Sequence, residues 1–120
     1  MSATQAAEDG RVCIDVAQRA KGERSWTYIG CLISKGHTVG VPFSILGWRT
    51  YVDVTQTQSR PRELVMTELQ ECRRIAYATP RSGGVAASEG AKREMERVFT
   101  ECATSRGYAV EAHPGAATGT

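Results

Sequence analysis

The chain has 120 residues, a formal net charge of +2 and 23% charged residues, which is the composition of one ordinary globular domain. Its basic residues are scattered among acidic ones, so nothing points to a nucleic-acid partner. No apolar stretch approaches the roughly 20 residues that a transmembrane helix needs. Residues 1–10 lack the basic start and apolar centre of a secretory signal, so the chain is either cytoplasmic or has lost its signal.

The predicted elements begin after a flexible tail over residues 1–10. Residues 11–39 predict a helical hairpin, because Cys13 and Cys31 each lie in an apolar stripe with helical spacing. The stretch 26–29 also favours a β-strand. The second element of this hairpin therefore stays open between helix and strand.

Residues 40–58 predict a β-hairpin and connection, because apolar residues alternate on both sides of Gly47. Pro42 restricts the first of these strands to an edge or an irregular position. Residues 59–110 predict a second helical hairpin, and residues 111–120 a flexible tail. The predicted fold is mostly α with a small β-hairpin, an α+β class, in one domain over residues 11–110.

The two helical hairpins read as copies of one repeat. Residues 20–39 align with residues 91–110 at identical pairs that include Cys31/Cys102, Ser34/Ser105, Gly36/Gly107 and Val39/Val110. Random segments of this length share about one or two identities. Each copy also has an upstream cysteine followed by alanine at the same spacing, Cys13 and Cys72. A coincidence between two similar helix ends is the competing explanation, since glycine after a basic residue commonly ends a helix.

The four cysteines allow three disulfide pairings, and the repeat selects Cys13–Cys31 and Cys72–Cys102. The alternative is four buried free thiols. Closely spaced cysteine ligands for zinc, a haem-attachment motif and a redox Cys-x-x-Cys are all absent from the sequence, so we expect no metal and no cofactor. Disulfides indicate an oxidising compartment, which predicts a periplasmic or secreted protein, with a cytoplasmic one as the alternative.

Helix ends account for the most distinctive residues outside the cysteines. Gly36 and Gly107 are predicted to end helices in the left-handed conformation, with His37 and Tyr108 folding back over the last turn. The other histidine, His113, lies in the predicted tail. No nucleophile, acid–base or phosphate-binding motif occurs. The sequence therefore predicts no catalytic residues.

Aromatic residues in and near the β-hairpin are the candidates for binding a partner. The predicted stripes of the helices do not account for all of them, and surface aromatics commonly anchor interfaces. A place in the core is the equally plausible alternative. The candidates are Trp48, Tyr51, Phe43 and Trp26.

The stretch Phe99-x-x-Cys102-x-x-x-Arg106-Gly107-Tyr108, with Cys72 upstream, resembles small envelope proteins of Gram-negative bacteria. Many of these are lipoproteins or periplasmic proteins whose C-terminal motif is Cys-x-x-x-[Lys/Arg]-Gly-[Tyr/Trp]. The resemblance covers mainly residues 61–110, and Ala103 stands where such proteins often have methionine. It implies an exported, disulfide-bonded helical hairpin, and it implies no shared catalytic residues.

The function expected from these observations is that of a non-catalytic exported protein that binds or scaffolds other proteins. Such a protein can be an accessory subunit of a membrane or envelope complex, with an unidentified protein partner. A small periplasmic enzyme inhibitor or enzyme is one alternative. A cytosolic regulator with free thiols is another.

Overall fold

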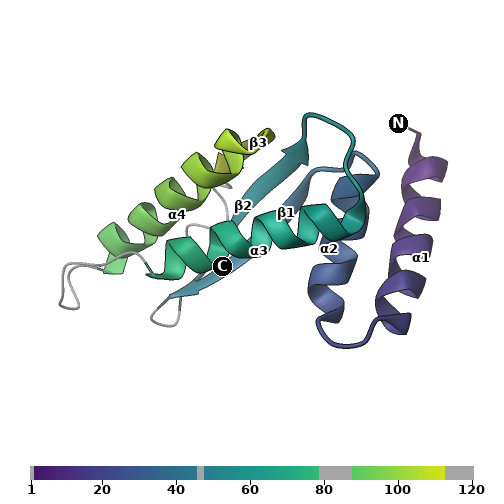
Figure 1. The fold of residues 1–120 in the computed structure, drawn as a ribbon, viewed down its shortest axis with the longest axis horizontal. Helices are drawn as coiled ribbons and strands as arrows, with labels where there is room; N and C mark the ends of the chain where they lie inside the picture. The colour runs from purple at the N-terminus through teal and green to yellow at the C-terminus, as the bar shows by residue number, and fades with distance from the viewer. Residues whose placement is uncertain (1, 46–47, 79–87, 113–120) are drawn as a thin grey trace.

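The computed structural model describes residues 2–45, 48–78 and 88–112. In this part of the chain, two helices and a strand occur twice, with one further strand between the two sets (Figure 1). The elements in chain order are α1 (Ala3–Arg19), α2 (Arg24–Ser34), β1 (Val39–Ile45), β2 (Trp48–Gln56), α3 (Arg62–Ala78), α4 (Ser88–Ser105) and β3 (Tyr108–Ala112). The expected α+β fold with two disulfide-linked helical hairpins is confirmed.

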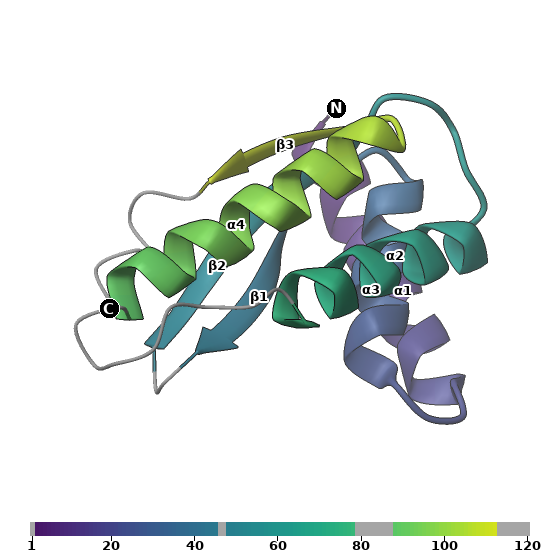
Figure 2. The ribbon, with the colours of Figure 1, turned by 60° about the vertical axis from the view of Figure 1, so that its left-hand side comes forward.

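The three strands form one antiparallel sheet in the order β1-β2-β3. Helices α3 and α4 lie side by side over the same face of this sheet (Figures 1 and 2). Helix α2 packs between α1 and α3. The strand β1 follows it in the chain. Helix α1 lies at one end of the molecule. Among the described elements, α2 is the only one with which it makes substantial contact.

The core lies between the sheet and the helices α2, α3 and α4. Alternate residues of the strands point into it, as the period of two in the sequence requires. Phe43 is fully buried at its centre, 4.9 Å from the ring centroid of Phe99 in an edge-to-face arrangement. The cluster also includes Ile29, Ile33, Val41, Val52, Val54, Val65, Leu69, Cys72, Ala76, Met95, Ala103 and Tyr108. Helix α1 contributes no residue to this cluster.

The prediction of a flexible N-terminal tail over residues 1–10 is wrong, because α1 begins at Ala3. Ser2 caps the helix with its hydroxyl oxygen, which accepts a hydrogen bond of 3.0 Å from the Gln5 N–H. Asp9, inside the predicted tail, is buried. The second element of the first copy, left open between helix and strand, is the helix α2.

The strand β3 is a further difference, since residues 111–120 were predicted to be a flexible tail. Glu111 and Ala112 belong to β3 and pair with Asp53 and Val52 of β2. Ala and Glu are poor strand formers, which is why the local sequence gives no sign of this strand. Residues 113–120, 79–87 and 46–47 lie outside the described part of the chain, and with them the rest of that tail and part of the second helical hairpin predicted over residues 59–110.

Helices α2 and α3 pack closely at Gly30, which is buried. A Cβ atom added there would collide with Cγ of Met66 and would lie 3.3 Å from the backbone oxygen of Arg62. Gly10, within α1, has no such neighbour within 4 Å. Glycine is unfavourable inside a helix, so its presence at position 30 is explained by this close packing.

We expect Gly30→Ala to lower the free energy of unfolding by about 1–3 kcal/mol, the usual cost of overpacking a close contact. Gly10→Ala is the matched control, and it should raise stability by about 0.5–1 kcal/mol, because alanine favours the helix and meets nothing. Urea unfolding of the two variants checks both signs. A stabilising effect of Gly30→Ala would show that α2 and α3 are less tightly packed than described.

Candidate functional site

Each copy of the repeat is closed by a disulfide between its two helices. Cys13 of α1 is bonded to Cys31 of α2, and Cys72 of α3 is bonded to Cys102 of α4, with Cα–Cα distances of 5.5 and 5.6 Å. These are the pairs that the repeat predicts. All four cysteines are bonded, so a regulator with free thiols has no support. Such bonds are typical of proteins from oxidising compartments.

The second helix of each copy ends at a glycine in the left-handed conformation. Gly36 and Gly107 have φ angles of 95° and 91°, which a residue with a Cβ rarely adopts. The N–H of Gly36 donates to Ile33 O, and the N–H of His37 donates to Leu32 O. This pair of bonds is the Schellman motif, in which the last carbonyl groups of the helix are satisfied. At the second end, the N–H of Gly107 donates to Thr104 O.

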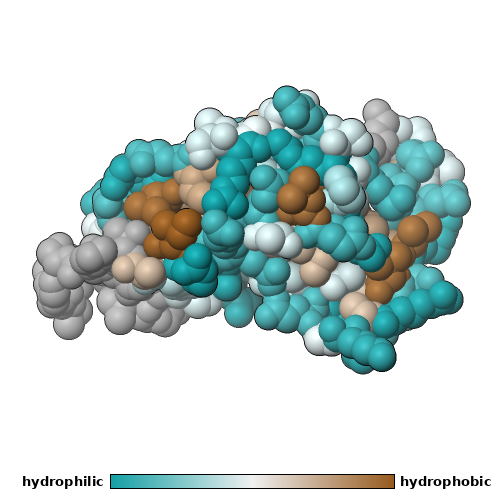
Figure 3. All heavy atoms as spheres, in the orientation of Figure 1, coloured by the Kyte–Doolittle hydropathy of each residue, from teal (hydrophilic) through white to brown (hydrophobic). Residues whose placement is uncertain are grey.

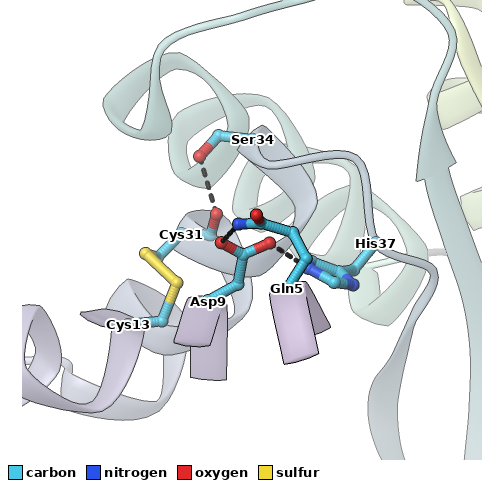
Figure 4. Close-up of a disulfide and its surroundings, with 6 residues drawn as sticks. All are labelled: Gln5, Asp9, Cys13, Cys31, Ser34 and His37. Atoms are coloured by element: carbon cyan, nitrogen blue, oxygen red, sulfur yellow. Dashed lines mark hydrogen bonds and ion pairs between the residues drawn. A yellow bond between two sulfur atoms is a disulfide. The ribbon is translucent and has the colours of Figure 1, made fainter. Parts of the chain in front are cut away.

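The residue after the first of these glycines connects α2 to α1. His37 Nε2 lies 2.8 Å from Asp9 Oδ2, and the Gln5 side-chain amide donates to Asp9 Oδ1 at 2.9 Å (Figure 4). Both ring and carboxylate are largely shielded, with 18% and 9% of their side-chain surfaces exposed. The hydrogen bond with His37 is the main reason why the pKa of Asp9 lies below its usual value. The pair therefore fixes α1 at a second point beside the Cys13–Cys31 bond.

The lowered pKa of Asp9 makes the contribution of this carboxylate to stability pH-dependent. It is fully present above the pKa of an unfolded aspartate, about 3.9, and is lost as the pH falls through the lower folded value. Asp9→Asn should therefore be less stable than the wild type near neutral pH, and the difference should shrink toward pH 2.

Thermal unfolding across this pH range measures the difference, and Asp15→Asn, at a well-exposed carboxylate on the same helix, serves as the control. A difference between wild type and Asp9→Asn that stays constant with pH would contradict the role of the ionised Asp9 carboxylate.

The residue after the second glycine holds a different set of contacts. Tyr108 is buried, and its hydroxyl donates to Glu68 Oε1 at 2.9 Å. Burial, followed by this bond to a carboxylate, raises the pKa of Tyr108. The guanidinium carbon of Arg60 lies 4.3 Å from the centre of the Tyr108 ring, and Arg60 Nε lies 3.4 Å from Glu68 Oε1. Arg60 also donates hydrogen bonds to the carbonyl oxygens of Arg106 and Gly107. These bonds tie the C-terminal end of α4 to the connection after β2.

The surroundings of the two glycines predict different costs for the same substitution. Gly36→Ala meets no atom within 4 Å and should cost about 1–2 kcal/mol for the left-handed backbone alone. In Gly107→Ala the new Cβ collides with Nη2 of Arg60, so this variant should lose more stability. Urea unfolding of both variants measures the difference in their free energies of unfolding.

The same two substitutions in an Arg60→Ala background identify the cause. The excess cost of Gly107→Ala should disappear there, because the colliding atom has been removed. If Gly107→Ala still costs more stability than Gly36→Ala without Arg60, the excess comes from the backbone instead.

Two side chains of α3 bond to the edge of β1 that does not pair with β2. Arg73 Nε donates to Pro42 O at 2.9 Å, and the hydroxyl oxygen of Tyr77 accepts a bond of 2.8 Å from the Ser44 N–H. Arg73 also donates to the Tyr77 hydroxyl and lies over its ring, 4.8 Å from the centroid. Pro42 itself has no N–H that would be left unsatisfied at this edge. The edge of β1 is thus closed to a further strand at these positions.

Of the four aromatic candidates for partner binding, Phe43 is wrong. It is fully buried in the core, so it cannot meet a partner. Trp26 is partly buried against the core, with Arg73 5.6 Å from its ring centre. Trp48 begins β2, and its side chain lies outside the described residues.

Tyr51 remains, and it lies on the face of the sheet opposite to the core, since its neighbours Thr50 and Val52 are both buried. It is partly exposed and stands directly across from Pro42 in the register. A Cβ added to Gly40 would lie 3.5 Å from Cβ and Cδ1 of Tyr51, so the Tyr51 side chain lies beside Gly40 on this face. Arg49 extends this surface toward the hairpin end of β2. We call the face formed by these residues and Asp53, Thr55, Ala109 and Glu111 the outer face.

The helical side of the molecule offers a less continuous surface. Figure 3, which looks onto α3 and α4, shows separate apolar patches among hydrophilic side chains. The large apolar residues with substantial exposure are Val12, Ile14, Leu64 and Ile75. Within residues 2–45, 48–78 and 88–112, no helix is long and apolar enough to cross a bilayer. The same residues contain no group of three or more His, Cys, Asp or Glu side chains arranged to hold a metal ion.

Sequence reasoning missed the residues that make contacts between distant parts of the chain. Asp9 was assigned to a tail, and neither Arg73 nor Tyr77 was singled out on α3. Each of them acts on a residue far away in the sequence, such as His37 or Pro42. The only available signal was the helical spacing of Arg73 and Tyr77, four residues apart on one side of α3.

Comparison of this chain with models of protein families, with curated proteins and with solved structures found no match.

Proposed function

We propose that this chain is a non-catalytic, exported protein that binds or scaffolds other proteins in the bacterial envelope, and that its outer face is the binding surface. The observation that carries the proposal is the outer face with Tyr51 at its centre, which none of the described helices covers. All the helices that pack on the sheet contribute to the core on its other face. As an accessory subunit, the chain would lie in the periplasm or outside the cell, in keeping with its two disulfides.

The chemistry of the outer face suits protein recognition. Tyrosine offers a large, rigid and amphipathic ring, and it is enriched among the residues that dominate binding energies. Tyr51 belongs to a strand that pairs on both sides, so its backbone is already ordered before a partner covers it. Arg49 and Asp53 flank it along the strand with opposite charges and would supply polar contacts at the rim.

Site-specific photo-crosslinking in the native cells tests this proposal. A photoreactive amino acid is placed at Arg49 or Thr55 on the outer face, and at Arg93, an exposed position on α4, as the control. We expect one crosslinked protein from the outer-face positions, lost in Tyr51→Ala, and none from Arg93. Thermal unfolding of Tyr51→Ala, which should shift by only a few degrees, shows whether the loss reflects binding rather than folding. Crosslinks from Arg93 alone, or from no position, would contradict the proposal.

A further inference from the structure

The two edges of the sheet differ in how their peptide groups are used. On β1, the outward groups of Pro42 and Ser44 are bonded by Arg73 and Tyr77. On β3, no side chain among the described residues makes an equivalent bond to the backbone of Ala109, Val110 or Glu111. A strand edge with free peptide groups is a template for another strand.

The register identifies which groups of β3 are free. The Thr57 N–H donates to Gly107 O at 3.2 Å, so these two opposed residues form a hydrogen-bonded pair. Such pairs alternate along an antiparallel ladder. Counting along the register, Ala109 and Glu111 bond to β2, whereas the N–H and C=O of Val110 point away from the sheet. On β1 the same alternation directs the groups of Pro42 and Ser44 outward, as their bonds to α3 require.

The outer face beside this edge is acidic. Asp53 and Glu111 stand directly opposite each other on β2 and β3, an arrangement in which like charges destabilise a sheet. Neither carboxylate has an ion pair or a hydrogen bond with another described residue. A depression of about 190 Å³ runs along this part of the face, lined by Thr38, Asp53, Thr55, Ala109, Val110 and Glu111. A cation beside Glu111 would relieve the repulsion.

We propose that β3 receives an extended segment of a partner protein as a fourth strand, and that this segment carries a lysine or arginine opposite Glu111. The N–H and C=O of Val110 supply the main-chain bonds. The basic side chain lies on the outer face by Glu111 and Asp53, and the residue opposite Val110 is apolar, because Val110 packs against the core. This inference rests on the proposed function and specifies the chemistry of the partner.

Pairing of β3 with β3 of a second copy is disfavoured by the same charges. An antiparallel pair centred on Val110 would satisfy the peptide groups of both chains. It would also gather Asp53 and Glu111 of both copies on one face, four carboxylates without a cation among the described residues. Like charges at neighbouring cross-strand positions oppose such pairing. A basic segment meets the same edge with complementary charge.

Hydrogen exchange on the whole chain tests the edge directly. In the free protein, the Val110 amide should exchange faster than those of Ala109 and Glu111, which bond to β2. The probe is a short acetylated and amidated peptide that alternates lysine with valine, and the same peptide with glutamate in place of lysine is its control. We expect the lysine peptide to slow exchange at Val110 and the glutamate peptide to leave it unchanged.

Variants separate the main-chain bond from the charge. Val110→Pro removes the outward N–H at an edge position where proline is tolerated and should abolish binding of the lysine peptide, whereas Val110→Ala should retain it. Glu111→Lys should weaken that peptide roughly tenfold and favour the glutamate peptide, since an attraction becomes a repulsion. Glu8→Lys on α1, an exposed carboxylate without an ion pair among the described residues, makes the same change of net charge and should leave binding unaltered.

The outcomes distinguish this inference from the proposed function. Unchanged exchange at Val110 in saturating lysine peptide, or equal binding of both peptides, overturns the inference. Protection of Val110 that grows with protein concentration in the absence of peptide would assign the edge to a second copy and overturn it too. If the envelope partner still crosslinks to the outer face of Val110→Pro with undiminished yield, the proposed function stands and the fourth strand does not.

Discussion

The hydrogen bonding of β2 on both sides holds the two copies together. Alternate residues of this strand direct their peptide groups to β1 on one side and to β3 on the other. Because β1 follows the first helical hairpin and β3 follows the second, each copy is attached to the sheet by its own last strand. The core between sheet and helices can form only when both copies share β2, which belongs to neither. Two short hairpins that could not each bury a sufficient core thus become one domain.

The repeat made the covalent framework predictable. A pattern that occurs twice selects one pairing of four cysteines, and it also places glycine at both helix ends, where the left-handed conformation excludes most other residues. Both signals are local, since they depend on residues within one hairpin. The spacing of apolar residues likewise predicted α3, α4 and the β1–β2 hairpin.

Contacts between distant segments were not predictable in this way. The repeat alignment maps β3 onto residues 37–41, which contain the start of β1, so the third strand was implied by the duplication. The weak strand propensity of Ala109 and Glu111 concealed it. The position of α1 before residue 11 depends on Asp9 meeting His37, 28 residues away. Phe43 was assigned to a surface because the sequence does not reveal which face of a hairpin the helices will cover.

The order in which the strands are synthesised has a consequence for assembly. The first hairpin, β1 and β2 leave the ribosome before the second hairpin, and β3 is the last of the described elements. Until β3 is made, the peptide groups of Asp53 and Thr55 stand unpaired along β2. A chain that stops before residue 108 would therefore display the nine-residue edge of β2 in place of the five-residue edge of β3. Such edges recruit other chains into aggregates, so the synthesis of β3 also removes an opportunity for misassembly.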